Sequence, residues 1–296
     1  MIKLTFLGTS DAFPSVERNH TSILLSYKDE NILIDCGEGT QRQFRKARLN
    51  PHKVTRLLIT HWHGDHVLGI PGLLQTLVFN GYNKTLFIYG PKGIKENIKK
   101  ILELFPSQKK LEISIQEVNG KFFENEDFFL EAEKMTHGIP CNAYTFVKKD
   151  VLRIDKKKLE ETKLQGPVLK QLKNGKDISY QGKKYKAKDF TYLEKGKKIS
   201  FVLDTSFNDR IIPFVKNSDL LICESTFGED LAELADEYKH LTVKKVAEIA
   251  KKSKSKKLVL THISQRYSRD LKLVLDSCKK IFKNSVLAKD FDTFEI

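Results

Sequence analysis

Residues 60–66 read THWHGDH and stand at the end of the apolar run RLLIT. The segment brings four side chains of metal-binding type, His61, His63, Asp65 and His66, into one tight turn, where Gly64 permits a sharp backbone bend. Imidazole nitrogens and carboxylate oxygens are suitable zinc ligands. A lone histidine is usually a structural or surface residue, but a cluster this dense between a strand and an apolar helix predicts a metal site.

Other apolar runs along the chain have the same kind of ending. Asp35, Asp204, Glu224 and His262 each stand at the end of a strand-like run, and polar groups at strand ends form the sites of α/β sheets. The strand-like runs are LTFLG, TSILLSY, NILIDCG, TRLLITH, TLFIYG, LEISIQEV, KISFVLDT, DLLICEST and KLVLTHIS. Helical periodicity predicts helices near residues 40–49, 67–79, 92–104, 242–252 and 269–281.

The bulk composition excludes several classes of protein. With 296 residues the chain is long enough for a sizeable core, and no apolar run reaches the roughly 20 residues that cross a membrane. The first residues, MIKLTFLGTS, have no signal-peptide cleavage pattern. The four cysteines are scattered without a C-x-x-C pair. This pattern favours reduced core residues over disulfides, and a cytoplasmic location.

The net charge of +14 is concentrated in one segment. Residues 148–198 hold 17 Lys and Arg residues against 7 Asp and Glu residues, whereas the rest of the chain is nearly balanced. The segment has too few apolar positions to form much core. A domain linker and an arm inserted in a single domain both fit it, and we favour the arm. A concentrated basic region favours a polyanionic partner over a generally basic surface.

The whole chain resembles a known family. H-x-H-x-D-H is similar to the signature of the metallo-β-lactamase superfamily. The segments FLGTSDAFPS (6–15), DCGEGTQRQ (35–43), HGDHVLGIPGLL (63–74) and HISQRY (262–267) resemble RNase Z. The resemblance implies an α/β fold, a four-layer αββα metallo-β-lactamase-like sandwich with a protruding basic exosite arm. A single domain would span residues 1–296, with the arm inserted at 148–198.

The resemblance also implies the remaining metal ligands. His137 in KMTHGIP, Asp204 in FVLDTS and His262 in LTHIS match later positions of the family pattern. Each of the three alone is more often structural. A first zinc ion would be held by His61, His63 and His137 and a second by Asp65, His66 and His262. Asp204 would bridge the two, because its two oxygens can bind separate cations. The expected cofactor is two Zn²⁺ per subunit, with other divalent metals left open.

Four residues would serve the chemistry. Asp65 would orient or deprotonate the attacking water while binding metal, and His240 in KHLTVKKVAEIA resembles the family histidine that protonates the leaving oxygen. His240 alone could equally cap the next helix or lie on the surface. Asp35 would support the metal-binding histidines, with a helix cap near Thr40 as the alternative. Glu224 is a weaker candidate, as the partner that orients His240.

The implied substrate is precursor tRNA, whose 3′ trailer would be removed to leave a 3′-hydroxyl. The arm sequence GPVLKQLKNGK resembles the exosite that grips tRNA, usually for the partner subunit of a homodimer; a solvated, mobile loop is the alternative. Phosphate contacts position a substrate without reading its sequence. The arm residues expected to contact RNA are Gly166, Pro167, Lys170 and Lys173. Those expected near the cut are Arg18, Asn19, Ser264, Arg266 and Tyr267, although Arg266 also suits a structural ion pair.

Three other functions fit parts of the sequence. A small-molecule hydrolase of the same superfamily would explain the metal motif but not the basic arm. A DNA or mRNA nuclease of the superfamily commonly has an additional large domain, for which this chain has little room. An RNA-binding relative without catalysis would have no need of all seven ligands.

Overall fold

The computed structural model describes residues 1–105, 110–162 and 164–296. The chain divides into two compact units. The first comprises Met1–Phe123, Leu130–Phe146 and Lys198–Ile296, and the second comprises Glu124–Phe129 and Val147–Lys197. Among the described residues, no helix combines the length and the apolar character needed to cross a bilayer.

Two seven-stranded sheets form the centre of the first unit. The strands of the first sheet are β1 (Ile2–Gly8), β2 (Ser22–Tyr27), β3 (Glu30–Ile34), β4 (Arg56–Leu58), β5 (Leu86–Gly90), β6 (Ile113–Glu117) and β18 (Thr293–Glu295). Their order is β18-β1-β2-β3-β4-β5-β6. The pairs from β18 to β3 are antiparallel and those from β3 to β6 are parallel. The parallel strands therefore end at one common edge.

The second sheet has the same construction. Its strands are β7 (Gly120–Glu124), β8 (Phe128–Met135), β9 (Cys141–Lys148), β14 (Lys197–Val202), β15 (Leu220–Glu224), β16 (Leu258–Thr261) and β17 (Ser285–Leu287). Their order is β17-β16-β15-β14-β9-β8-β7, and β14 to β17 are parallel. The register places Val202 opposite Cys223 and Glu224 opposite Thr261. These strands also end together.

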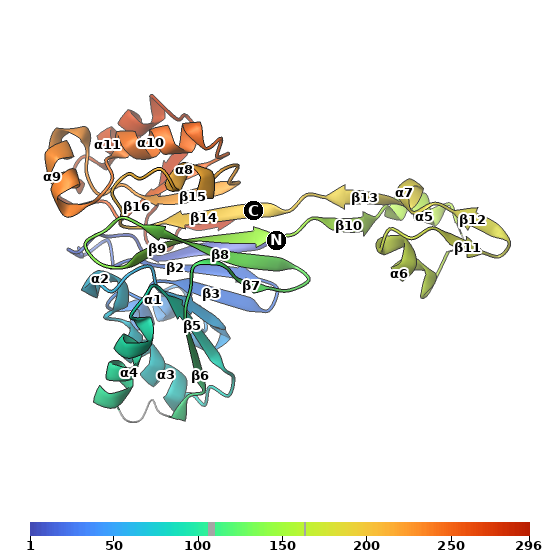
Figure 1. Ribbon diagram of the computed structural model, residues 1–296, viewed down its shortest axis with the longest axis horizontal. Coiled ribbons are helices and arrows are strands. Elements are labelled where there is room, and N and C mark those ends of the chain that lie inside the picture. The colour runs from blue at the N-terminus through green and yellow to red at the C-terminus, as the bar shows by residue number, and fades with distance from the viewer. Residues whose placement is uncertain (106–109, 163) are drawn as a thin grey trace. The chain divides into compact units, whose positions relative to one another are not determined.

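Helices cover the outer face of each sheet, as Figure 1 shows. On the first sheet lie α1 (Thr40–Lys46), α3 (Ile70–Phe79) and α4 (Ile94–Leu104), and on the second lie α8 (Ile211–Phe214), α10 (Val243–Lys252) and α11 (Leu271–Lys279). Among the described residues, this unit also contains α2 (Gly64–Val67), α9 (Ala232–Tyr238) and short 3-10 turns at Pro51–Lys53, Glu229–Leu231 and Gln265–Tyr267. The layers are α/β/β/α, so the expected fold class is confirmed.

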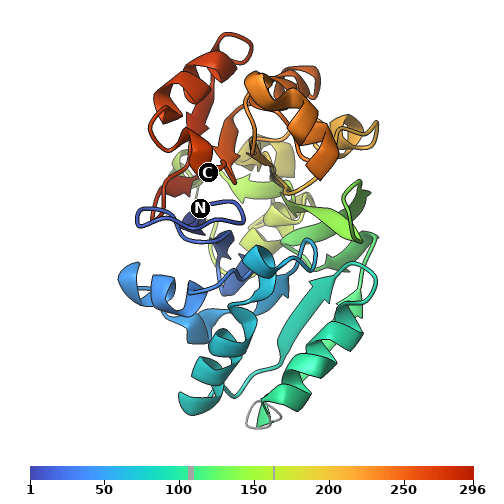
Figure 2. The same ribbon diagram turned by 90° about the vertical axis from the view of Figure 1, so that its left-hand side faces the viewer.

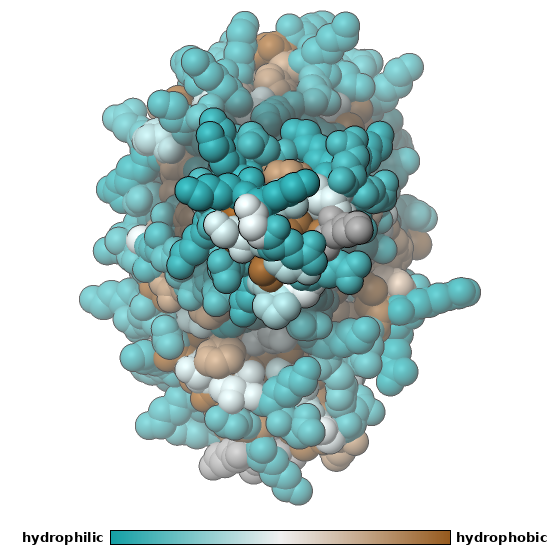
Figure 3. Space-filling model, turned by 90° about the vertical axis from the view of Figure 1, so that its right-hand side faces the viewer, coloured by the Kyte–Doolittle hydropathy of each residue, from teal (hydrophilic) through white to brown (hydrophobic). Residues whose placement is uncertain are grey.

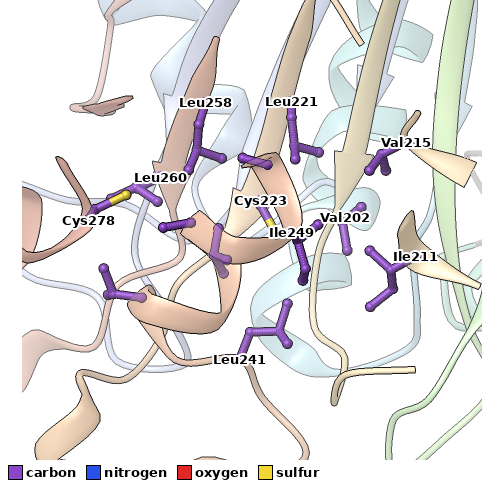
Figure 4. Packing of buried hydrophobic residues seen from close by; sticks show 14 of the residues in the cluster. Val202, Ile211, Val215, Leu221, Cys223, Leu241, Ile249, Leu258, Leu260 and Cys278 are labelled. Carbon is purple, nitrogen blue, oxygen red and sulfur yellow. The ribbon is translucent and has the colours of Figure 1, made fainter. Parts of the chain in front are cut away.

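Packing of amphipathic helices onto apolar strands builds these layers. Val246, Ala247 and Ala250 of α10 are buried, and the side chain of Thr242 caps the helix by accepting a hydrogen bond from Lys245 N. Figure 4 shows the resulting core, in which helix side chains meet those of β14, β15 and β16. A matching cluster lies between the first sheet and α1, α3 and α4. The two cores hold the strand ends rigidly in place.

The structure adds strands that the sequence patterns did not indicate. β8 and β9 were not expected, although both lie in the second sheet. The helix expected over residues 67–79 begins only at Ile70, as α3, and the short α2 before it ends at Val67. Gly69 between them approaches the Gly37 carbonyl, and a Pro stands at the start of α3. The N- and C-termini lie side by side (Figure 2), because β1 pairs with β18.

The second unit is small and has its own core. β10 (Val151–Ile154) pairs with β13 (Thr191–Glu194), and β11 (Ile178–Tyr180) pairs with β12 (Lys183–Tyr185). Its helices are α5 (Lys156–Glu160), α6 (Val168–Lys173) and α7 (Ala187–Phe190). Leu164, Leu172, Ile178 and Ala187 form a buried cluster, so this segment forms more core than its composition predicted. Lys163 lies outside the described residues.

The molecular surface agrees with the high charge. The face drawn in Figure 3 is mainly hydrophilic, and hydrophobic side chains show there only as small separate patches. Scattered apolar side chains of that kind are normal on protein surfaces.

Candidate metal centre

Three of the expected site residues have an unusual backbone. Asp35 follows β3, Asp204 follows β14 and His262 follows β16, with φ of +56°, +52° and +54°. Residues other than glycine rarely take this left-handed conformation, and it persists where the surrounding structure enforces it. Each strand therefore ends in a sharp turn at the position of an expected site residue.

Three histidines and Asp204 form a first cluster of donor atoms, all within 4.8 Å of one another. His63 Nδ1 lies 3.1 Å from His61 Nε2 and 3.1 Å from His137 Nε2. Asp204 Oδ2 lies 3.4 Å from His61 Nε2. The carbonyl oxygen of Lys239 lies 3.2 Å from His137 Nδ1. A carbonyl can only accept, so it fixes the proton on Nδ1 and leaves the Nε2 lone pair facing the cluster.

A second cluster shares Asp204 with the first. It contains Asp65, His66, Asp204 and His262, all buried, again with donor atoms within 4.8 Å. His66 Nε2 lies 3.2 Å from His262 Nε2 and 3.3 Å from Asp65 Oδ2. Asp204 presents Oδ2 to His66 and Oδ1 to His262, at 3.3 Å each. The Oδ2 atom of Asp204 therefore lies near both clusters, and its Oδ1 atom lies near the second.

The donor set fits a pair of divalent cations. The Oδ1 atom of Asp204 is buried and makes no hydrogen bond within the described part of the chain. Leaving a carboxylate oxygen buried and unsatisfied costs free energy unless a charge compensates it. Nitrogen and carboxylate oxygen donors in two groups of four match the coordination of zinc. The structure therefore brings together all seven residues that the sequence predicted as ligands.

Asp35 orients two of the histidines. Its Oδ2 atom lies 2.7 Å from His66 Nδ1, and it accepts hydrogen bonds from Thr60 Oγ1 at 2.7 Å and, through Oδ1, from Thr60 N at 2.7 Å. Thr60 Oγ1 also lies 3.0 Å from His61 Nδ1. Because the hydroxyl donates to Asp35, it accepts from the His61 ring. Both rings are thereby held with Nε2 toward the other ligand candidates.

Glu224 repeats this arrangement on the second sheet. The hydroxyl of Thr226 donates to Glu224 Oε2 at 2.6 Å and lies 3.0 Å from His262 Nδ1. Glu224 Oε1 lies 3.1 Å from His240 Nδ1 and accepts from Thr205 N at 2.8 Å. Each buried carboxylate thus holds one histidine directly and one through a threonine hydroxyl. His240 joins a metal-ligand network without being part of either ligand cluster around Asp204.

Burial and close neighbours shift the pKa values of the ligand candidates in both directions. Burial alone would lower the pKa of His66, but Asp204, Asp65 and Asp35 raise it well above its ordinary value. Burial likewise opposes the ionised form of Asp65 and Asp204, yet neighbouring histidines hold the pKa of both carboxyls well below its ordinary range. Burial lowers the pKa of His61, which keeps that ring neutral. Asp65 and Asp204 thus stay ionised among the ligand candidates, and bound divalent cations would interact favourably with both carboxylates.

A cavity of about 720 Å³ gives access to the clusters. His63, Asp65, His137, Asp204, His240 and His262 all line it. Burial lowers the pKa of His240, but the charge of Glu224 and the hydrogen bond to it prevail and raise this pKa to about 9. His240 therefore carries a proton at neutral pH beside the metal ligands.

Comparison with known proteins identifies the family. A family model described as anti-Pycsar protein Apyc1 matches residues 2–138. The ribonuclease Z of Oceanobacillus iheyensis is 38% identical over 307 aligned residues that cover 100% of both chains. The chain belongs to the ribonuclease Z family. The ribonuclease Z of Nanoarchaeum equitans is 36% identical and covers 98% of this chain and 92% of its own. The crystal structure of the short form of human tRNase Z has a TM-score of 0.72 and 27% identity, with 99% of each chain covered.

Two of the residues that are expected to contact RNA lie beside the metal-ligand clusters of this chain. Ser264 and Arg266 line the same cavity as the clusters. Tyr267 lies outside it, and its hydroxyl accepts from Gly228 N at 2.9 Å and donates to Asp230 at 3.0 Å. Ser264 and Arg266 are therefore better placed than Tyr267 to meet a bound substrate.

Arg18 and Asn19 have internal partners. Arg18 is buried and donates to the carbonyl oxygen of Ala288 at 2.7 Å. Asn19 Nδ2 donates to the carbonyl oxygen of Glu38 at 2.6 Å. These contacts hold loops of the ribonuclease Z fold together, and an RNA contact by either residue stays a prediction.

The four expected arm residues lie in the second unit. Gly166 has φ of +71°, and Pro167 caps α6. Lys170 and Lys173 lie on α6, and both are exposed. The positions suit a basic surface, but they do not show what binds to it.

Three functional groups of the site were missed in the sequence. The hydroxyls of Thr60 and Thr226 donate to Asp35 and Glu224 and lie within hydrogen-bond distance of His61 and His262. The carbonyl oxygen of Lys239 contacts the ring of His137. Thr60 directly precedes the ligand candidate His61, and Thr226 follows Glu224 by two positions, so their placement beside motif residues was an available signal. The Lys239 contact is made by the backbone, which leaves no trace in residue identity.

Proposed function

We propose that the chain is a tRNA 3′-processing endoribonuclease that hydrolyses a phosphodiester to remove the 3′ trailer of precursor tRNA and leaves a 3′-hydroxyl. The observation that carries the proposal is the position of the Asp204 carboxylate, which is shared by the two ligand clusters. It lies near His61 of the first cluster and near His66 and His262 of the second, in a cavity that His240 also lines. The substrate class is supported by relatives named ribonuclease Z and by a structural neighbour named tRNase Z.

The proposed cofactor is two zinc ions per subunit. His61, His63 and His137 would hold one ion and Asp65, His66 and His262 the other, with Asp204 shared between them. When bound, two such cations lower the pKa of water and neutralise charge on the phosphate. Other divalent cations suit the same donors.

The residues of the chain would supply positioning and proton transfer. Asp65 lines the cavity and stays ionised, so it can accept a hydrogen bond from the attacking water and orient it. His240 is anchored through Nδ1 to Glu224, which leaves Nε2 to donate its proton to the leaving oxygen. A histidine with a pKa of about 9 retains that proton at neutral pH. General acid catalysis of this kind typically contributes about 10²–10⁴-fold.

The second unit would bind the body of the tRNA. Its segment of residues 148–198 carries 17 Lys and Arg residues against 7 Asp and Glu residues, and Lys170 and Lys173 are exposed. Phosphate contacts of this kind hold many tRNAs without reading their sequence. Homodimeric assembly and a cytoplasmic location are also part of the proposal. Light scattering of the purified protein tests the dimer.

A cleavage assay on precursor tRNA tests the function. The purified protein should cut a precursor with a 3′ trailer once, at the trailer boundary, and chelator should abolish the cut until zinc is restored. Bis(p-nitrophenyl) phosphate serves as a substrate that lacks the tRNA body. Hydrolysis of this small diester without precursor cleavage would favour a small-molecule hydrolase, and cleavage that persists without metal would contradict the mechanism.

A further inference from the structure

Two exposed aromatic rings line the cavity that contains the metal ligands. The side chain of Phe13 is 61% exposed and that of Tyr238 is 54% exposed. Both residues line the cavity together with Asp65 and His240. Single exposed aromatic residues are common on protein surfaces. Two exposed aromatic residues that line the same cavity as the metal-ligand candidates are better placed to contact a substrate that enters it.

The backbone of Phe13 is fixed relative to the metal centre. Ser10 Oγ donates to the carbonyl oxygen of Phe13 at 2.7 Å, and Phe13 N donates to Asp11 Oδ1 at 3.1 Å. The same loop is joined to the ligand-bearing segment, since Ser10 forms a β-bridge with Ile263 and His262 N donates to Thr9 O at 3.0 Å. The loop thus positions the ring rather than leaving it on a free chain.

The backbone of Tyr238, which lies far from Phe13 in the sequence, is also fixed relative to the metal centre. It ends α9, and the next residue, Lys239, takes a left-handed backbone with φ of +58°. His240 N donates to Ala235 O at 2.8 Å, and the Lys239 carbonyl holds the ring of His137. The turn that presents Tyr238 is therefore the same turn that carries His240 and supports a ligand.

We propose that Phe13 and Tyr238 form a stacking subsite for the nucleobases next to the scissile phosphate. The inference rests on the proposed function. With a phosphate at the cations, the adjoining bases lie within the cavity, where flat apolar faces are available. Stacking on aromatic rings tolerates any base, because every base has a π-face. An enzyme that cuts many different trailers needs contacts of that kind.

Abasic substrates combined with point variants test the subsite. Precursor tRNAs are prepared with a single abasic ribose at each of the positions flanking the cut. For the wild-type protein, the abasic position that faces a ring should lower kcat/KM by about 5- to 150-fold, the range for loss of about 1–3 kcal/mol of stacking. Phe13→Leu and Tyr238→Leu remove the ring but keep an apolar side chain. Each leucine variant should have a lower kcat/KM than the wild type on the intact precursor. For each variant, one abasic position should cause no further loss of kcat/KM.

Three controls make the result specific. Phe13→Tyr and Tyr238→Phe keep a ring and should retain the sensitivity to the abasic position. Phe79→Leu removes an aromatic ring that is 72% exposed but does not line the cavity, and it should behave as the wild type. Zinc content and thermal melting of each variant report folding separately.

Two results would overturn the subsite. If an abasic position costs the wild type and both leucine variants the same factor, the rings do not stack on that base. An absence of any abasic effect in the wild type is equally decisive. Both results leave precursor cleavage intact, whereas a failure of the wild type to cut the unmodified precursor would reject the proposed function together with this subsite.

Discussion

The carboxylate of Asp204 lies on a left-handed turn with φ of +52°, between two groups of histidines. Asp204→Ala removes the group shared by both clusters and leaves histidines without a compensating charge. We expect the variant to lose bound metal and precursor cleavage together, which elemental analysis and the cleavage assay measure. Asp209→Ala changes an exposed carboxylate in the same loop and serves as the control. Full metal occupancy in Asp204→Ala would show that Asp204 does not bridge.

Thr226 contacts no bound cation in the proposed site and acts through its neighbours. Its hydroxyl joins Glu224 to His262, so Thr226→Val should leave the His262 ring free to turn. Loss of such a supporting contact typically costs about 10–100-fold in metal affinity. Competition against a chelating dye measures this affinity. Thr226→Ser restores the hydroxyl and should recover most of it, and equal weakening in both variants would argue for a packing role instead.

The effect of replacing His240 on the rate should depend on whether the leaving group needs a proton. We expect His240→Ala to retain metal but to slow precursor cleavage by about 10²–10⁴-fold, because an alkoxide needs a proton. Hydrolysis of bis(p-nitrophenyl) phosphate should be much less affected, since nitrophenolate leaves without one. Near-normal precursor turnover at saturating substrate would exclude the role.

The pH profile follows from the same residue. His240 must be protonated to act, and Glu224 raises its pKa to about 9 against the effect of burial. The kcat of the wild type should therefore hold through neutral pH and fall as pH rises through about 9. The fall should be absent in His240→Ala. A wild-type kcat that falls at the pKa of an ordinary histidine would contradict the assignment.

At the scale of residues, the sequence predicts ligands better than it predicts their supports. His61, His63, Asp65 and His66 form a dense motif, and such density is rare without a metal. His137 and Asp204 needed the family pattern, because a single His or Asp is common everywhere. Threonine hydroxyls and backbone carbonyls have no distinctive spacing, and only the folded geometry shows that they hold the rings.

At the scale of elements, the strands that carry the site were predicted from the sequence, whereas β8 and β9 of the second sheet were not. Apolar runs that end in a polar residue, such as β3, β14, β15 and β16, coincide with the strands that carry the site. β8 shows the alternation of buried and partly exposed residues, with Glu131 and Glu133 among the partly exposed ones, so a period-two signal was present in its sequence. β9 is buried along most of its length, so period-two alternation is absent.

The small core of the second unit gives a prediction at this scale. Leu172 is fully buried in the cluster with Leu164, Ile178 and Ala187. Leu172→Ala should destabilise this unit by about 2–5 kcal/mol, which amide hydrogen exchange measures locally. The first unit should keep its protection and its hydrolysis of bis(p-nitrophenyl) phosphate. Leu193→Ala, at a residue 50% exposed, is the matched control. Loss of protection throughout the chain would mean that the two units unfold together.

At the scale of the whole molecule, the excess of basic residues and the proposed catalytic site lie in different parts of the chain. The first unit contains the His and Asp clusters that are proposed to hold cations, whereas the segment of residues 148–198 contains most of the net positive charge. A polyanion is held by Lys and Arg through many weak contacts, and each contact releases counterions. Substrate affinity and the chemical step should therefore respond to different changes of the protein.

Removal of the basic segment tests that division. Replacing residues 150–197 with a short glycine-serine link should raise the KM for precursor tRNA strongly while leaving bis(p-nitrophenyl) phosphate hydrolysis near its original rate. Precursor affinity of the intact protein should fall steeply with added salt, and the log–log slope should become shallower in the shortened protein because fewer phosphate contacts remain. The small diester makes too few contacts for a comparable slope. Equal losses on both substrates would mean that the segment supports the fold of the metal centre, and an unchanged salt slope would place the tRNA-binding charges in the first unit.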